Sequence, residues 1–293
     1  MTPITQINRR QLLAGTAAAV ALPGLRAQSA WPAKPIRFVV PFAPGGTSEI
    51  VARSVAAELT KQLGQSVFVE NKPGGAGVTA MQDVAKAPAD GYTMILTHVG
   101  TLAVNPYMLK NQPYDVNKDF APVTLLAKVP NVFVIHPDVP ARNFQEFVAY
   151  AKKNPGQLNY GSAGNASAGH LAMEYLDRQA RFEATHVPYK GAAPALTDLL
   201  AGRTQASSAG MPALGAHIRA GKLLAYAVTS PQRLPQLPEV PTAALGRLPQ
   251  GTSIGGIVAP AAQEEGLNQT AVDFDTFPLG DSAGTQLSSG CAY

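Results

Sequence analysis

The sequence predicts an α/β fold with two lobes and a cleft between them, and three observations support this prediction. Short apolar runs of strand length alternate with helical patterns along most of the 293 residues, which favours mostly parallel pairing. About 266 residues follow an N-terminal leader, and a chain of this length usually divides into two units. Two loops of small residues each precede a helix, so we expect them to face each other across the cleft.

The opening unit reads as a strand, a glycine turn and a helix. Ile36, Phe38, Val39 and Val40 form an apolar run of strand length. Gly45 and Gly46 lack a Cβ, so the backbone can turn sharply there and a ligand can come close. Thr47 or Ser48 is a suitable N-cap for the following helix. The unit therefore offers free N–H groups at a helix N-terminus, which is a place for a small anion.

The remaining elements follow in a regular order. The expected strands cover 66–70, 92–97, 120–128, 131–136, 158–160, 185–187, 223–228 and 254–258, and the expected helices cover 78–86, 144–153, 168–179 and 192–200. Residues 263–293 show neither a helical nor a strand period, so we expect them to form a disordered tail.

The first 27 residues are expected to be an export signal peptide. Arg9 and Arg10 precede the apolar run 12–22, and Ala27 ends a small-residue cleavage site. The paired arginines resemble a twin-arginine signal, although ordinary secretory signals also contain such pairs. Cleavage after Ala27 would lower the formal charge from +4 to +1, because it removes three arginines and no acid. The positive net charge of the whole chain therefore gives no reason to expect a nucleic-acid partner.

A second loop of small residues, 161–169, lies between a predicted strand and a predicted helix. Ser162 and Ser167 offer hydroxyls, and three glycines permit close approach of the backbone. Taken alone, the loop fits an ordinary strand-to-helix turn, but together with the first loop it favours an anion-binding cleft. His170 follows the loop and either stabilises an anion or packs in the core. Tyr189, at another such turn, is a candidate to cover the ligand.

Six motifs occur in a fixed order along the chain: PFAPGGTSEIVAR, ENKPGGAGVTA, APADGYTMIL, NYGSAGNASAGHLAMEYL, VPYKGAAPALTDLLAGR and IRAGKLLAYAVTSPQRLPQLPEVPT. Together they resemble the Bug-type substrate-binding receptors of tripartite tricarboxylate transporters over residues 31–261. The resemblance implies a type II periplasmic-binding-protein fold that closes on a small carboxylate. It also implies a periplasmic monomer that works with membrane transporter subunits, uses no cofactor or metal and is not an enzyme.

In such receptors two loops grip a ligand carboxylate, partly through ordered water, and here these loops are 41–49 and 161–167. The expected ligand is a di- or tricarboxylate, an amino acid or an aromatic acid. The candidate ligand-binding residues are Phe42, Ala43, Gly45, Gly46, Thr47, Glu49, Ser162, Ala163, Gly164, Ser167, His170 and Tyr189.

The resemblance also suggests domain limits: 28–128 as the first part of lobe 1, 129–228 as lobe 2, and 229–262 as a return to lobe 1. Three departures from the family pattern stand out. Glu49 replaces a common Asp, and the run 206–209 lacks an acid that usually faces the cleft. Residues 263–293 do not continue the helices that complete lobe 1, so we expect that part of lobe 1 to be missing or altered, as a frameshift or a truncated gene would produce.

Other patterns in the sequence fit alternative functions only in part. Residues 251–255 fit the nucleophile-elbow pattern, but a strand follows Ser253 where a helix is needed, and no histidine comes later. Residues 75–80 fit a dinucleotide-binding pattern, but the next strand ends without an acid for the ribose. The histidines show no metal spacing, and the single Cys291 cannot form an internal disulfide. An exported small-molecule enzyme and a non-functional product of a frameshifted gene remain the alternative hypotheses.

Overall fold

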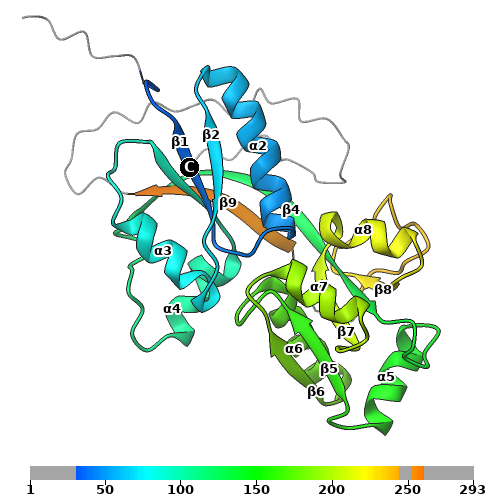
Figure 1. The fold of residues 1–293 in the computed structure, drawn as a ribbon. Helices are drawn as coiled ribbons and strands as arrows, with labels where there is room; N and C mark the ends of the chain where they lie inside the picture. Colours follow the sequence, from blue (N-terminus) through cyan, green and yellow to red (C-terminus); the bar gives the residue numbers. More distant parts are fainter. Residues whose placement is uncertain (1–30, 244–251, 261–293) are drawn as a thin grey trace, which may run out of the picture. The chain divides into compact units, whose positions relative to one another are not determined.

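A computed structural model describes residues 31–243 and 252–260, and the unit that begins at Lys34 contains every described helix and strand (Figure 1). Its strands pair in the order β2-β1-β3-β9-β4-β7-β5-β6, and β8 adds to β4 beside that path. Helices alternate with these strands along the chain, so the predicted α/β class is confirmed.

The first half of the fold contains parallel strands, beginning with the strand of the opening unit. Its strands are β1 (Ile36–Val40), β2 (Val67–Asn71) and β3 (Thr93–Thr97), and its helices are α2 (Thr47–Leu63), α3 (Val78–Ala85) and α4 (Asn105–Met108), with short helical turns η1 (Gly75–Gly77) and η2 (Gly100–Val104). β1 lies between β2 and β3 and pairs in parallel with both.

Helices cover both faces of this first half, which explains why β1 is apolar except at Arg37, whose side chain pairs with Glu70 and Asp83. Successive side chains of a strand point to opposite faces. Phe38 packs in the same buried cluster as Val55 of α2, whereas Val39 packs with Met81 of α3. Since both faces of β1 are buried, a polar alternation would not fit there.

The second half repeats the same layered arrangement. Its strands are β5 (Leu158–Ser162), β6 (Ala184–Pro188), β7 (Ala206–Gly210) and β8 (Leu224–Val228), and its helices are α5 (Phe144–Lys153), α6 (Ala168–Ala180), α7 (Ala192–Leu200) and α8 (Met211–Arg219). β5 pairs in parallel with β6 and β7. On β4, Phe133 packs with Met173 of α6, and the adjacent Val134 packs with Leu199 of α7 and Leu214 of α8.

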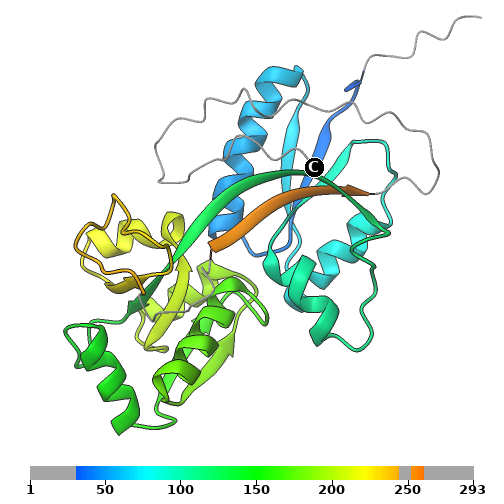
Figure 2. The same ribbon diagram turned by 180° about the vertical axis from the view of Figure 1, so that it is seen from behind.

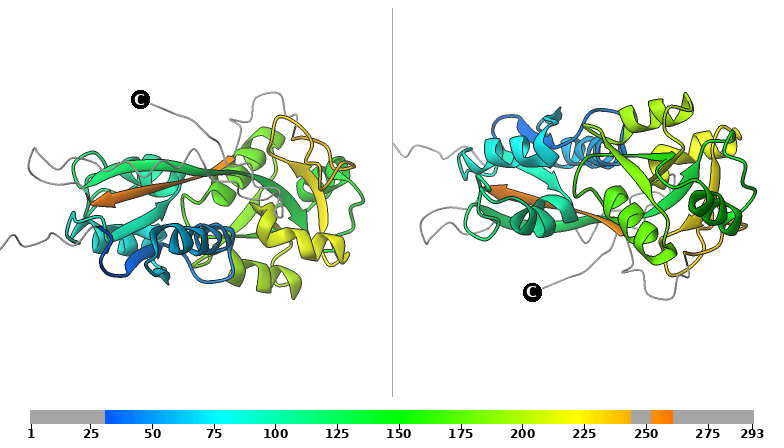
Figure 3. Two further views of the ribbon diagram at one scale, coloured as in Figure 1. Left: turned by 90° about the horizontal axis from the view of Figure 1, so that it is seen from above. Right: turned by 90° about the horizontal axis from the view of Figure 1, so that it is seen from below.

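Two long antiparallel strands connect the halves: β4 (Phe120–Ile135) and β9 (Thr252–Pro260) lie side by side (Figures 2 and 3). β9 also pairs with β3, while the end of β4 pairs with β7 and β8. The sequence predicted two strands in place of β4, and this was wrong. Pro130 pairs with Thr252 in the continuous ladder, and two register shifts accommodate the irregular positions after Pro122 and Leu125.

Several expectations fall outside the described residues or are not tested by them. The signal peptide, the region 244–251 and the tail 263–293 are not described. The expected lobe boundary at 128–129 falls inside β4, and the lobe limits stay a prediction. None of the helices described is both long and apolar enough to cross a membrane. Within the same residues, no three histidine, cysteine or acidic side chains gather in a way that would hold a metal ion.

Candidate functional site

An open cavity lies where the two halves of the fold meet. From the first half it is lined by Phe42, Ala43, Gly46, Thr47, Ser48, Glu49, Val51, Leu96 and His98, and from β4 by Ala127, Val129 and Asn131. From the second half it is lined by Ala163, Ser167, Ala168, Gly169, Ala192, Ala195, Ser207, Ser208, Ala209 and Gly210. Both loops that the sequence singled out therefore contribute to one cavity.

The first loop is held in shape by Glu49. One carboxylate oxygen of Glu49 accepts a hydrogen bond from the backbone N–H of Gly45, and the other accepts from Arg53 Nε at 2.8 Å. Burial opposes ionisation, but the hydrogen bonds from Gly45 and Arg53 keep the pKa of Glu49 below its ordinary value. Glu49 lines the cavity, yet both of its oxygens are engaged by its own loop and helix. We therefore assign it a role in fixing the turn, which Gly45 makes possible with a φ of 86°.

Thr47 occupies the first position of α2, and its hydroxyl stands out among the groups of the first loop. The hydroxyl oxygen is buried and has no hydrogen-bond partner in the described part of the chain. Its surroundings are tight, because a Cβ built on Gly210 would come within 2.7 Å of this oxygen. A buried hydroxyl without a partner is costly, so it marks a position where a ligand can supply the missing hydrogen bond.

The second loop divides its two serines between different tasks. Ser167 lines the cavity and caps α6, since its hydroxyl accepts from the His170 backbone N–H at 3.3 Å. Ser162 does not line the cavity. Its hydroxyl contacts His186 Nε2 at 2.6 Å and the backbone of Gly164.

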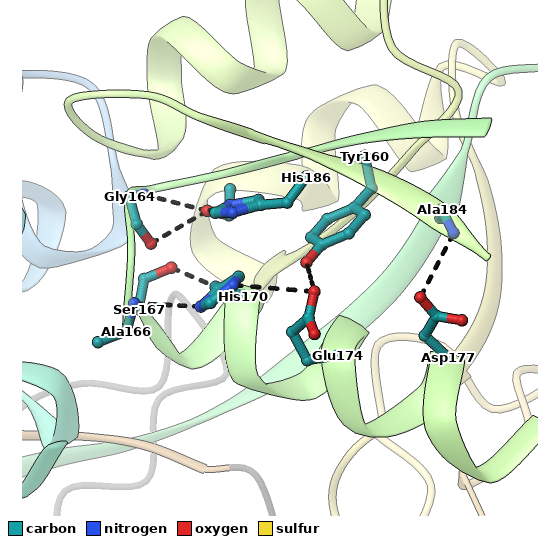
Figure 4. A network of polar contacts seen from close by, with 10 residues as sticks. Tyr160, Gly164, Ala166, Ser167, His170, Glu174, Asp177, Ala184 and His186 are labelled. Carbon is teal, nitrogen blue, oxygen red and sulfur yellow. Dashed lines mark hydrogen bonds and ion pairs between the residues drawn. The ribbon is translucent and has the colours of Figure 1, made fainter. Parts of the chain in front are cut away.

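Behind this loop a stack of aromatic rings joins β5, β6 and α6 (Figure 4). The rings of His170 and His186 stack with centroids 4.0 Å apart, and Tyr160 stacks on His186 at 4.9 Å. The hydroxyl of Tyr160 donates to Glu174 at 2.6 Å, and His170 Nδ1 accepts from the Ala166 backbone at 3.1 Å. Burial lowers the pKa of both histidines, for His186 to about 4. His170 therefore supports the loop backbone from behind and does not line the cavity.

The remaining candidates lie around the cavity but not in its wall. Tyr189 donates from its hydroxyl to Asp198 at 2.6 Å, and burial together with that hydrogen bond raises its pKa to about 12. Five of the predicted site residues do not line the cavity: Gly45, Ser162, Gly164, His170 and Tyr189. A direct contact between any of them and a ligand stays a prediction.

Several cavity residues were not anticipated as site residues from the sequence. Ser207 and Ser208 lie on β7, whose small polar sequence did not read as a strand. Gly210 precedes α8, a helix that the sequence analysis did not identify. His98 follows β3 directly, and Asn131 lies within β4. Only the fold brings these positions next to the two loops, because they come from β7, from β4 and from the end of β3.

Four helices begin at this cavity. α2 contributes Gly46 and Thr47, α6 contributes Ser167 and Ala168, α7 contributes Ala192, and α8 contributes its N-cap Gly210. Each helix N-terminus carries free N–H groups and a partial positive charge. No lysine or arginine is found among the described lining residues. Among the described lining residues, the groups suited to an anion are therefore helix N-termini and neutral donors.

Backbone contacts tie the two sides of the cavity together. The N–H of Ala43 donates to the carbonyl of Lys190 at 2.8 Å. A Cβ on Gly191 would come within 2.9 Å of the Ala43 nitrogen, so the absence of a side chain there permits this contact. The first loop and the N-terminus of α7 are thus in direct contact on one side of the cavity.

Comparison with known proteins adds a family to this geometry. A profile described as "Tripartite tricarboxylate transporter family receptor" matches residues 51–270. The solved structure of the periplasmic binding protein BugD is 35% identical, with a TM-score of 0.76 over 80% of this chain and 79% of that one.

Two further solved structures from Rhodopseudomonas palustris are similar and contain acids. One, with adipate, is 37% identical with a TM-score of 0.77, and covers 80% of this chain and 79% of that one. The other, MatC with bound malate, is 33% identical with a TM-score of 0.75, and covers 80% of this chain and 81% of that one.

Proposed function

This chain belongs to the receptor family of the tripartite tricarboxylate transporters, as its motifs suggested, and we propose that it is an exported solute receptor that binds a small carboxylate in the cavity described above. The observation that carries the proposal is the convergence of four helix N-termini on one cavity. The adipate and malate in two similar structures support the same ligand class.

Binding at this cavity needs no chemistry by the protein. Among the described lining residues, Glu49 carries the one carboxyl group and His98 the one imidazole. Both oxygens of Glu49 accept hydrogen bonds within its own loop and helix, and Nδ1 of His98 accepts from the backbone of Gly100. We therefore propose a receptor and not an enzyme. Its place would be the periplasm, as a monomer that delivers the ligand to membrane subunits of the transporter.

The ligand carboxylate is proposed to contact the hydroxyl of Thr47 and the first N–H groups of α2. A charge-assisted hydrogen bond contributes roughly 1.5–3 kcal/mol, so a few of them, less the costs of desolvation and ordering, support affinities in the micromolar range. The experiment is calorimetry of the mature protein with a panel of mono-, di- and tricarboxylates, amines and neutral sugars. Binding of sugars or amines without any acid would refute the proposal.

A pair of hydroxyl deletions locates the site. Thr47→Val keeps the shape of the side chain and removes the donor, and we expect it to weaken acid binding by roughly 1–3 kcal/mol. Ser54→Ala is the matched control, because Ser54 lies exposed on the same helix and its hydroxyl donates only to the carbonyl of Ile50. Equal affinities for both variants and the parent protein would show that the carboxylate binds elsewhere.

A further inference from the structure

His170 holds the second loop from behind through a hydrogen bond to its backbone. The Nδ1 atom of His170 accepts from the N–H of Ala166 at 3.1 Å (Figure 4). Ala166 is 1% exposed and has a φ of 60°, in the left-handed region that residues other than glycine seldom adopt. A residue in that region requires support from its surroundings, and His170 supplies it at the N–H of Ala166.

Ala166 lies at a point where the loop meets both the cavity and the first half of the fold. It directly precedes Ser167 and Ala168, which line the cavity at the start of α6. Its carbonyl oxygen lies against Gly100, the first residue of η2, because a Cβ built on Gly100 would come within 2.5 Å of that oxygen. A change in the backbone of Ala166 would therefore move the cavity wall and alter the contact with the first half.

The hydrogen bond to Ala166 requires a neutral His170. A ring nitrogen that accepts a hydrogen bond carries no proton, so the proton of the neutral ring is on Nε2. Protonation would add an N–H at Nδ1, and this group would face the N–H of Ala166 where the two nitrogens are 3.1 Å apart. Two donors cannot bond to each other. The charged ring would therefore have to turn away from Ala166 or displace the loop.

The groups packed around His170 favour the neutral ring, with one exception. The rings of His186 on β6 and Tyr160 on β5 stack with it, at centroid distances of 4.0 and 6.5 Å, and restrict its rotation. His170 is also the third residue of α6, where the helix N-terminus disfavours a cation. Glu174 lies 3.9 Å from Nε2 and favours the charged ring, whereas Asp177, further along α6, accepts from the backbone of β6. Burial outweighs Glu174 and keeps the pKa of His170 below its ordinary value.

We propose that His170 is a positioning residue for ligand binding: its neutral imidazole keeps Ala166 and the cavity wall that follows in the shape that accepts the acid, and protonation of the ring weakens binding. This inference rests on the proposed function, because it requires an acid in the cavity. A cationic His170 that attracts the acid would give the opposite pH dependence. The direction of the pH profile therefore separates the two roles.

The test is calorimetry of the mature protein with fumarate, malate and adipate at pH 7.5, 6.5, 5.5 and 5, with circular dichroism at each pH to check that the protein is folded. His98 and His186 have pKa values of about 4, so both stay mostly neutral in this range. The same series with His170→Asn corrects for protonation of the ligand itself. Between pH 7.5 and pH 5, the parent protein should lose at least threefold more affinity than the variant.

Two failures of this test have different meanings. If an acid binds but the parent and His170→Asn share one pH profile, or if the parent binds relatively more tightly at pH 5, this inference is overturned while the proposed function stands. If none of the acids binds at any pH, the proposed function fails and the inference fails with it.

Two substitutions separate the acceptor from the charge. His170→Asn keeps an acceptor near the Nδ1 position and does not titrate, so its affinity at pH 7.5 should lie within threefold of the parent. His170→Leu has no acceptor for the Ala166 N–H and should bind at least tenfold more weakly. His217→Asn is the matched control, because His217 lies in the last turn of α8 and is not among the described lining residues. Equal affinities for the parent, His170→Asn and His170→Leu would contradict the role of the acceptor.

A measurement on the unmodified protein is independent of how the variants fold. NMR should find the ring proton of His170 on Nε2 at pH 7.5, and the amide resonance of Ala166 should titrate together with the ring. Bound acid should lower the pKa of His170, because the complex favours the neutral ring. A pKa that rises on binding, or an Ala166 amide that does not follow the ring, would overturn the proposal.

Discussion

The buried, neutral His98 predicts how the stability of this protein depends on pH. Its pKa lies near 4 in the folded protein and at 6.5 in the unfolded chain, because burial disfavours the charged ring. Between these two values the unfolded chain binds a proton that the folded protein does not. The free energy of unfolding must therefore decrease as the pH falls from about 6.5 to about 4, and be independent of this group above pH 7.

The magnitude follows from the same two values. The difference between 6.5 and about 4, at about 1.4 kcal/mol per pKa unit, gives up to about 3 kcal/mol lost on acidification. This is a large share of the roughly 5–15 kcal/mol that stabilises a typical domain. Replacing His98 by a side chain that does not titrate should remove this contribution. At neutral pH the variant keeps only the cost of its altered contacts with Phe42 and Gly100.

Urea unfolding of the parent protein and of His98→Asn at pH 7.5, 6, 5 and 4 measures this contribution. The stability advantage of the parent over the variant should shrink by about 2–3 kcal/mol between pH 7.5 and pH 4. His98→Gln serves as the control, because it also lacks a titrating group but alters the local contacts differently. An advantage that is constant across this range, or that grows towards pH 4, would refute the assignment of a buried neutral histidine.

Three further substitutions test other parts of the structure. Gly191→Ala should weaken ligand binding by tenfold or more in calorimetry, because its Cβ would collide with the backbone nitrogen of Ala43; unchanged affinity would show that this contact is dispensable. Ser162→Ala should lower the free energy of unfolding in urea by roughly 1–3 kcal/mol, because it leaves His186 and the Gly164 backbone without their partner, and a stability equal to the parent would contradict this role. Met81→Ala should cost roughly 2–5 kcal/mol in the same assay, because Met81 is fully buried under β1 and β3, whereas a loss below about 1 kcal/mol would mean that the core there repacks.

Local patterns were sufficient to predict most of the elements. The apolar run of β1, the glycines after it and the spacing of α2 lie within one stretch of sequence, so the unit could be recognised without its surroundings. β7 was not recognised because Ala206–Gly210 consists of small residues without an apolar run. Its burial comes from neighbours that are distant in the sequence, including β4 and β5. β4 was divided in two at Pro130 because prolines usually interrupt strands, but here Pro130 continues the ladder and pairs with Thr252, the first residue of β9.

The candidate site, like the fold, could be predicted from the sequence only in part. The two loops were predicted as sources of hydroxyls and N–H groups, and both line the cavity. The direction of each hydroxyl could not be predicted, because it depends on the partners that the fold brings within reach. Ser162 found His186 on the neighbouring strand, whereas Thr47 and Ser208 found no partner in the described structure. His98 had no sequence signal of its own, since its neutral state depends on burial and its contact with Gly100 depends on the fold.

The sequence by itself therefore determined the α/β class, the family and the two glycine-containing loops, because each of these is written in short-range patterns of apolar, small and helix-capping residues. The tertiary structure decided which groups share the cavity. α2 is far in the sequence from α6, α7 and α8, yet all four helices begin at the same cavity, because β4 and β9 connect the two halves of the sheet. Charge and polarity at a site depend on distances in space, and only the packing of these strands sets those distances.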